Sequence, residues 1–525
     1  MANLFSTEDR RVVPNWRSFG KTTVLGELDS FQLERREQRS PTSIEEYIID
    51  WELNSGVTFA SDLLSAAIVN NQLDNKSVIK AAKYILRNKN NASYSQVSLA
   101  ERVINPSQNK KDAKSALINS DIETILSSIN PEPLHQKIRS LKKVIKKAPS
   151  NSIAYVELSR YYSILGQEQK ALHFINIALN LSPNNRFVLR SATRLYTHYA
   201  SDNNDHLQHI YRILTKNPIT KYDPWLLSAE IAVSTILNKH SKFIKKGMQM
   251  ISSNKVAPFS FTELASGIAT VELLNGSNKK SKTFFDKALI NPNDNTLAQI
   301  EWASTKDSRF DLNPEEFRVE NNYEAIALDS FQKQKFDDSL ENAAKWFLDM
   351  PFSKRPLIFA SNLASTILGD QDKSIMFLKA GEMSHPHDPL ILNNLAYAYA
   401  QKNNTIEALA ALGRISNYER IESSTRICIG ATRGLIMFRS GNEEGGRRLY
   451  MEAIEKTKQI GNSELNWIAI LNYAREEIFA KSEYVEPIME AVSQIPENSG
   501  FLEVDILKKK IIETYKKGKS VPNKG

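Results

Sequence analysis

The chain reads SIAYVELSRYYSILGQEQKALHFINIALNLSPNN from residue 152 to residue 185, and this stretch predicts two helices joined by a tight bend. In its first half, apolar and aromatic residues recur every three or four positions, which places them on one face of a helix. They are Tyr155, Leu158, Tyr162 and Leu165. Gly166 follows at the expected bend, where a residue without a Cβ atom costs least.

The second half of the stretch predicts a helix that packs against the first. Its apolar residues have the same helical spacing and are Leu172, Ile175 and Leu179. Ala171 and Ala178 are small, so they would let the two helices approach closely. Pro183 ends the unit, because proline cannot continue a helix.

Prolines recur along the chain at a nearly constant distance. Steps of 34 and 35 residues separate Pro149, Pro183 and Pro218. A further step of 35 residues separates Pro351 and Pro386. Each proline follows one apolar helical run and precedes another, so we expect a helix pair as the repeating unit.

This unit resembles the tetratricopeptide repeat (TPR), a family that builds helix–turn–helix units of 34 residues. In 152–185 the residues on the family's signature positions are Tyr155, Leu158, Ser159, Tyr162, Gly166, Ala171, Ala178 and Pro183. The windows 389–422 and 427–460 match as well. Two looser windows carry Ser339 and Ser374 where the family has its small residue.

The resemblance implies an all-α fold, an α-solenoid of stacked antiparallel helix pairs that forms a TPR-like superhelix. Residues 57–71 and 75–87 predict another pair, with Asn75 or Ser77 as a helix cap. Residues 461–516 predict three helices that close the solenoid. We divide the chain into five parts. They are an N-terminal arm or linker (1–40), an N-terminal helical region (41–117), a partly degenerate repeat block (118–319), a regular repeat block (320–460), and capping helices with a basic tail (461–525).

The composition agrees with long helices and short loops. The chain has 19 Gly and 19 Pro among 525 residues, well below the roughly 12% that the two make up on average. So few turn-forming residues disfavour β-sandwiches and propellers. The hydrophobic share of 41% and the charged share of 24% are typical of a folded protein.

The compartment is expected to be the cytoplasm. The first ten residues turn acidic and then basic before any apolar run, so we expect no signal peptide. No stretch reaches 18 apolar residues, and we expect no membrane contact. Cys428 is the only cysteine, which excludes an intrachain disulfide and a thiolate-rich zinc site. Its apolar neighbours favour a buried thiol with a raised pKa.

No motif predicts a catalytic site, a cofactor or a metal. Residues 20–22 (Gly-Lys-Thr) match the end of a phosphate-binding loop, but Asn15 replaces its first glycine and no strand precedes it. His206 and His209 share a helix face, yet a zinc site needs three or four converging ligands. We expect a non-enzyme. An enzyme or effector within 1–110 stays open as an alternative.

The net charge of +8 comes from two patches on a slightly acidic body. Residues 133–147 carry six cations and no acid, and residues 505–525 carry seven lysines against two acids. The candidate patch residues are Arg139, Lys142, Lys143, Lys146, Lys147, Lys508, Lys509 and Lys510. They support an alternative function, a nucleic-acid-associated or regulatory repeat protein. No aromatic residue interleaves with the lysines of 133–147, which argues against single-strand binding.

The primary hypothesis is a non-catalytic scaffold or adaptor. Stacked pairs form a concave groove lined by their first helices, and solenoids bind partners there. The resemblance places Asn394 where the family often uses Asn to bond a ligand's backbone. The full groove set is Asn393, Asn394, Tyr397, Gln401, Leu435, Phe438 and Arg439. We expect this groove to bind a protein or peptide partner, and the protein to help assemble a multiprotein complex. Self-association is compatible with this hypothesis.

Overall fold

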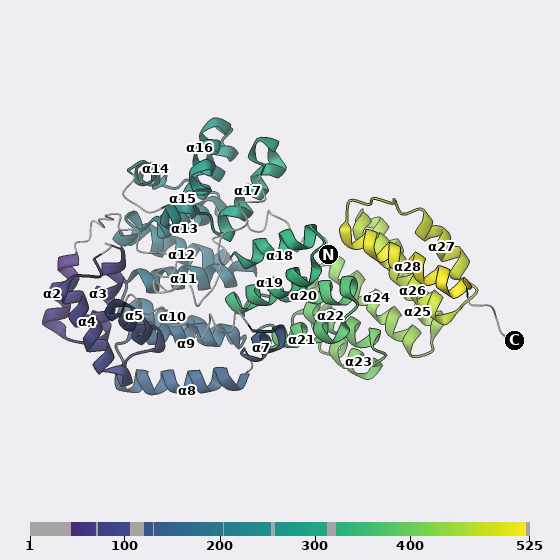
Figure 1. Cartoon of the computed structure of the whole chain (residues 1–525), viewed down its shortest axis with the longest axis horizontal. Helices are drawn as coiled ribbons and strands as arrows, with labels where there is room; N and C mark the ends of the chain where they lie inside the picture. Colours follow the sequence, from purple (N-terminus) through teal and green to yellow (C-terminus); the bar gives the residue numbers. More distant parts are fainter. Residues whose placement is uncertain are drawn as a thin grey trace. The chain divides into compact units, whose positions relative to one another are not determined.

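The computed structural model places helices over nearly all of the chain that it describes (Figure 1). The described residues are 44–69, 72–105, 120–129, 131–202, 204–253, 258–311 and 322–520. Within these ranges there is no β-strand, and no helix is both long and apolar enough to cross a membrane. The predicted all-α class is therefore confirmed.

The described chain divides into two compact units. The N-terminal unit contains the described residues up to 329 together with 348–350, and the C-terminal unit contains 330–347 and the residues from 351 onward. The division falls where α18 (Tyr323–Gln332) and α19 (Phe336–Asp349) follow one another. The five-part division expected from the sequence stays a prediction.

Before α18, the described residues of the N-terminal unit form fifteen α-helices, most of which pack against a neighbour in the chain. They are α2 (Ile44–Asn54), α3 (Val57–Val69), α4 (Lys76–Arg87), α5 (Tyr94–Ile104), α7 (Ile122–Ser127), α8 (Pro131–Lys147), α9 (Ser152–Ile164), α10 (Glu168–Leu181), α11 (Arg186–His198), α12 (Asn204–Lys216), α13 (Pro224–Ile236), α14 (Ile244–Ser252), α15 (Pro258–Leu274), α16 (Asn278–Ala288) and α17 (Asp294–Lys306).

The C-terminal unit continues the same arrangement, with one π-helical turn. Its elements after α19 are α20 (Arg355–Asn362), the π-helix η7 (Leu363–Leu368), α21 (Gln371–Glu382), α22 (Pro389–Gln401), α23 (Thr405–Gly413), α24 (Ser423–Arg439), α25 (Glu443–Gln459), α26 (Ser463–Ala480), α27 (Val485–Ser493) and α28 (Leu502–Ser520). The three closing helices expected in 461–516 are confirmed as α26, α27 and α28.

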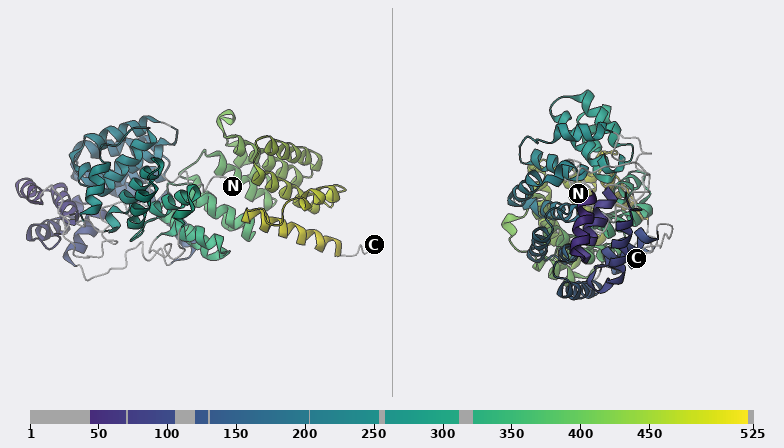
Figure 2. Two further views of the ribbon diagram at one scale, coloured as in Figure 1. Left: turned by 90° about the horizontal axis from the view of Figure 1, so that it is seen from above. Right: turned by 90° about the vertical axis from the view of Figure 1, so that its left-hand side faces the viewer.

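The repeating unit is a pair of adjacent helices, as the prolines predicted. The pairs α9–α10, α15–α16, α22–α23 and α24–α25 are in close contact along their length, and the left view of Figure 2 shows successive helices within each unit lying side by side. A helix ends just before Pro149, Pro183, Pro218 and Pro351. The stacked helix pairs form an α-solenoid.

The two helices of a pair cross at a small side chain. On the second helices these residues are fully or almost fully buried: Ala171, Ser281, Ser339, Ser374, Ala408 and Gly446. In the pair α9–α10, the hydroxyl of Ser159 donates a hydrogen bond of 2.8 Å to the carbonyl of Ala171 on the partner helix. A serine at the crossing therefore still permits the approach, because its hydroxyl bonds the neighbouring backbone.

A tight crossing lies between α24 and α25, where two glycines face each other. A Cβ atom on Gly446 would lie 2.8 Å from the carbonyl oxygen of Gly434 and 2.5 Å from the ring of Phe438. A Cβ atom on Gly434 would lie 3.1 Å from the carbonyl oxygen of Gly446. The turn between the two helices uses Gly441 at φ 82°, a left-handed conformation that suits glycine.

Asn and Asp side chains cap the N-termini of many helices. Of these caps, only Asn75 is predicted from the sequence. Asn75 is confirmed as the cap of α4, since its side chain accepts a hydrogen bond of 2.8 Å from the backbone N–H of Ser77. The same arrangement begins the helices α9, α11, α13, α17, α22 and α26, with the caps Asn151, Asn185, Asp223, Asn293, Asp388 and Asn462. Such a cap typically contributes about 1 kcal/mol.

Substituting Gly446→Ala is expected to destabilise the C-terminal unit, because the added methyl group overlaps Phe438 and the backbone of α24. Overpacking of this kind costs about 1–3 kcal/mol. The matched control is Gly430→Ala on α24, where a Cβ atom meets nothing within 4 Å. There, alanine should stabilise the helix by up to about 1 kcal/mol. Urea unfolding of both variants measures the difference, and equal stabilities would contradict the close crossing.

Candidate functional site

The candidate site lies on the first helices of the C-terminal pairs, which we call the first-helix row: α20, α22, α24 and α26. Neighbouring members of this row contact each other. Along α22, Asn393, Tyr397 and Gln401 are spaced four residues apart and therefore share one helix face. These are three of the residues that the sequence predicts in the groove.

Tyr397 joins α22 to α26. Its hydroxyl accepts a hydrogen bond of 2.9 Å from the Arg475 guanidinium and lies 2.9 Å from the amide oxygen of Asn472. The Arg475 guanidinium also lies 5.6 Å from the centre of the Tyr397 ring, within the range of a cation–π contact. Tyr397 is thus held in place by two side chains of α26, and neither belongs to the groove set predicted from the sequence.

A buried carboxylate, that of Glu476, joins α24 to α26. Arg439 donates two hydrogen bonds to it, at 2.7 and 3.2 Å, and Arg475 donates a third at 2.8 Å. Burial would lower the pKa of Arg475, but the neighbouring Tyr397 and Glu476 outweigh burial and hold that pKa above its ordinary value. Removing one partner from such a network typically costs 3–5 kcal/mol. Arg439 therefore positions the row.

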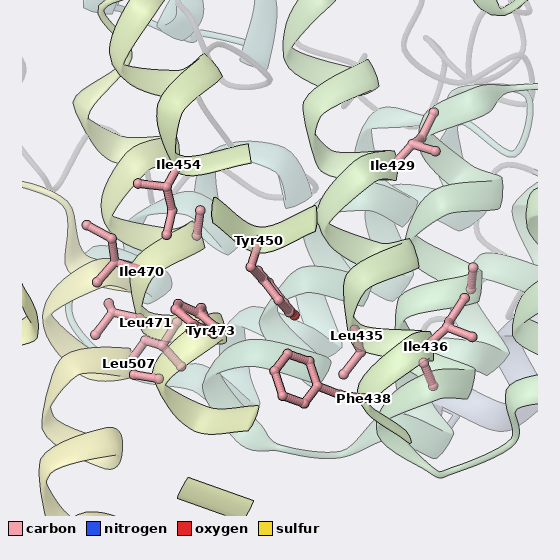
Figure 3. Close-up of a cluster of buried hydrophobic side chains, with 14 of the residues drawn as sticks. Ile429, Leu435, Ile436, Phe438, Tyr450, Ile454, Ile470, Leu471, Tyr473 and Leu507 are labelled. Atoms are coloured by element: carbon pink, nitrogen blue, oxygen red, sulfur yellow. The ribbon is translucent and has the colours of Figure 1, made fainter. Parts of the chain in front are cut away.

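Two of the predicted groove residues lie in the hydrophobic core. Leu435 is fully buried and Phe438 is 8% exposed. Figure 3 shows Phe438 beside Tyr450, with Tyr473 close by, and the ring centres of Phe438 lie 6.1 and 6.3 Å from theirs. The expectation that Leu435 and Phe438 point into an open groove is wrong, because α24 packs against α22, α25 and α26 at once.

The remaining groove residues present polar atoms whose hydrogen bonds are incomplete. Asn394 is half-buried, and its amide donates a hydrogen bond of 3.3 Å to the side-chain oxygen of Asn362 on α20. Three other atoms of the row are buried and have no hydrogen-bond partner among the described residues: Asn393 Oδ1, Gln401 Nε2 and Arg475 Nη2. Each buried polar atom without a partner costs about 1–3 kcal/mol, so a ligand that pairs with them gains free energy.

The C-terminal basic patch is largely structural. Lys508 is buried and donates a hydrogen bond of 2.6 Å to the carbonyl of Ile495. Lys510 donates to the carbonyls of Thr366 and Ile367 at the end of the π-helix, at 3.2 and 2.5 Å, and burial lowers its pKa. The expectation of a free cationic patch is therefore wrong for these two lysines, whereas the neighbouring Lys509 is exposed. Residues 521–525 lie outside the described residues.

The basic helix α8 differs, because its cations face solvent. Arg139, Lys142, Lys143, Lys146 and Lys147 are all exposed, as the amphipathic pattern predicted. Its apolar residues Leu134, Ile138 and Leu141 are buried.

The other predicted motifs bring no ligand set together in the described chain. His206 and His209 both lie against the ring of Tyr196, with ring centres 5.6 and 4.7 Å away. No group of three or more His, Cys, Asp or Glu side chains in the described ranges is placed to hold a metal ion. Burial raises the pKa of the Cys428 thiol, as expected, although the residue as a whole is only half-buried. The partial phosphate-loop motif at 20–22 lies outside the described residues.

A buried acid on α28 makes the stability of the C-terminal unit depend on pH. Glu503 is 8% exposed, and its Oε2 atom has no hydrogen-bond partner. Burial raises the pKa of Glu503 from 4.5 to about 7. Between these two values the unfolded chain loses the proton and the folded chain keeps it. The contribution of Glu503 to the free energy of unfolding is therefore fully present below pH 4.5, where the acid is protonated in both states. It is lost as the pH rises to about 7.

Substituting Glu503→Gln is expected to raise the free energy of unfolding by up to about 3 kcal/mol near pH 8. Near pH 4.5 it should have little effect, because the acid is then neutral in the folded state. The matched control is Glu513→Gln, an exposed position on the same helix, which should change little at either pH. Denaturant unfolding at both values measures the effect. A gain of equal size at both would contradict the raised pKa.

Neither a protein-family model nor a curated protein matches the chain. Solved structures similar to it include that of yeast Tom70, at 14% identity over 91% of this chain and 96% of that chain, with a TM-score of 0.27. A tetratricopeptide repeat protein from Parabacteroides merdae matches at 14% identity over 62% of this chain and all of its own, with a TM-score of 0.23. The human IFIT1 dimer with PPP-AAAA matches at 12% identity over 90% of this chain and 93% of that chain, with a TM-score of 0.30.

At these low scores, the assignment of the fold depends on the chain's own features. Consecutive helices are paired, helices end before prolines 34 or 35 residues apart, and small residues lie at the crossings. These features make the chain a TPR-like helical-repeat protein.

Proposed function

We propose that this protein is a non-catalytic cytoplasmic scaffold that binds a protein or peptide partner along its first-helix row and helps to assemble a multiprotein complex. The site is the face of α22 that carries Asn393, Tyr397 and Gln401, together with Arg475 on α26. The partner contributes an extended segment of main chain. Cytoplasmic location and the absence of catalysis remain part of this proposal.

One observation carries the proposal: the unpaired polar atoms on the row. The amide oxygen of Asn393 lacks a donor, and the nitrogens Gln401 Nε2 and Arg475 Nη2 lack acceptors. Most buried polar groups in proteins are paired, so three unpaired atoms on α22 and α26, which Tyr397 and Arg475 join, support a ligand as the missing partner. A peptide main chain supplies both a donor and an acceptor at every residue other than proline.

The spacing of the row also fits an extended peptide. Asn393 and Gln401 are eight residues apart on α22, which corresponds to about 12 Å along the helix. About four residues of extended chain span that distance. The Tyr397 hydroxyl donates a hydrogen bond to Asn472 and accepts one from Arg475. These bonds hold Tyr397 between the two amides, so the site is ordered before a ligand arrives. Such preorganisation lowers the entropy cost of binding.

The test uses peptides selected from a random displayed library on the full chain. A selected peptide should lose about tenfold or more in affinity when Gln401→Ala or Asn393→Ala removes its partner atom. Fluorescence anisotropy with the labelled peptide measures the loss. The matched control is Asn404→Ala, an exposed amide just before α23, which should bind normally.

Peptides that bind all three variants equally well would overturn the proposal, because they would use another surface. Failure to select any peptide would overturn it as well. Circular dichroism of each variant separates a lost contact from a lost fold.

A further inference from the structure

Helix α8 in the N-terminal unit presents a dense and unneutralised positive surface. Its cations Lys137, Arg139, Lys142, Lys143, Lys146 and Lys147 are all exposed, and Glu132 is the only acid of the helix. None of these six cations forms an ion pair with a described residue. At 1.5 Å per residue, Lys137 to Lys147 extends over about 15 Å.

Tyrosines of the neighbouring helix α9 lie against these lysines. Lys137 Nζ lies 5.8 Å from the ring centre of Tyr161, and Lys142 Nζ lies 5.8 Å from that of Tyr162. The lack of aromatic residues in the sequence 133–147 therefore no longer argues against single-strand binding. The sequence of α8 does lack aromatic residues, but the fold brings tyrosines from α9 beside it.

A third tyrosine, Tyr94 at the start of α5, is open to solvent. Its side chain is 70% exposed, and among the large hydrophobic side chains of the described residues only Ile406 and Leu53 are more exposed. Burial raises the pKa of Tyr161 to about 12, and Tyr94 is close enough to add to this effect. The start of α5 is held against α9, because Ser93 Oγ and the Ser95 N–H donate hydrogen bonds of 2.6 and 3.3 Å to Glu157, one helical turn before Tyr161. Tyr94 therefore belongs to the same surface as Tyr161, over whose ring Lys137 lies. We call the six cations of α8 together with Tyr94 and Tyr161 the α8 surface.

We propose that the α8 surface binds single-stranded nucleic acid, with the lysines and Arg139 on phosphates and a base stacked on Tyr94. A positive track beside an exposed aromatic ring is the arrangement that single-strand binding uses. This site is independent of the first-helix row, since all of its residues belong to the N-terminal unit.

Other anionic partners fit this surface less well. A lipid membrane would require an apolar face beside the lysines, but Leu134, Ile138 and Leu141 of α8 are buried. Double-stranded nucleic acid keeps its bases stacked in the duplex, so it offers Tyr94 nothing to stack on. An acidic peptide could pair with the lysines but has no planar base for the tyrosine.

The first test measures how salt affects binding of the full chain to a fluorescent oligothymidylate of about 20 nucleotides. The logarithm of the binding constant should fall linearly with the logarithm of salt concentration, by about 0.7 per phosphate contacted. The double variant Lys142→Gln/Lys146→Gln should reduce this slope by about 1.4. The matched control is Lys279→Gln/Lys280→Gln, two exposed lysines on α16, which should leave the slope unchanged.

The second test concerns stacking. Tyr94→Ala should weaken oligothymidylate binding by about 5- to 100-fold at fixed salt, whereas Tyr94→Phe should keep most of the affinity because the ring remains. Because Tyr94 is exposed, we expect neither variant to disturb the fold, and circular dichroism checks this.

Three results would overturn the proposal. Equal binding of a duplex of the same length would show charge attraction without base recognition. Unchanged affinity in Tyr94→Ala would show that the ring takes no part. Binding to phosphatidylserine vesicles or polyglutamate that exceeds oligothymidylate binding and depends on Lys142 and Lys146 would assign the surface to a lipid or an acidic protein.

Discussion

The close approach of the two helices in each pair is the constraint on which the rest of this structure depends. Two helices come together only where the side chain at their crossing is small, and Gly434 and Gly446 leave no room for even a methyl group. At other crossings a serine fits because its hydroxyl bonds the partner backbone, as Ser159 does with Ala171. Tight pairs bring successive first helices into contact, and this contact positions the polar residues that we assign to binding.

The two proposed surfaces use different physical means. The first-helix row depends on buried hydrogen bonds: Glu476 fixes Arg439 and Arg475, Arg475 fixes Tyr397, and three polar atoms nearby are left unpaired. The α8 surface depends on exposed charge, which acts over a distance of about 10 Å at moderate salt. A scaffold with both surfaces could bind a peptide by shape and hydrogen bonding, and a nucleic acid through charge and stacking.

The local pattern of the sequence predicted the helix pairs well, because prolines, small residues and apolar spacing act within one repeat. The prediction failed for Leu435 and Phe438, because α24 carries buried residues on several faces. The spacing of its apolar residues therefore does not reveal which face is open. The prediction also failed for Lys510, whose carbonyl partners Thr366 and Ile367 are more than 140 residues away. The tyrosines beside α8 were missed for the same reason: they come from another helix.

The central claim is that the unpaired polar atoms of the first-helix row hold a partner's main chain. Hydrogen–deuterium exchange on the full chain, with and without a selected peptide, tests it most directly. The account predicts that the peptide slows exchange in α22 and α26, where Gln401 and Arg475 lie, and leaves α23 and α25 unchanged. Slower exchange confined to α23 and α25, or to the N-terminal unit, would contradict it.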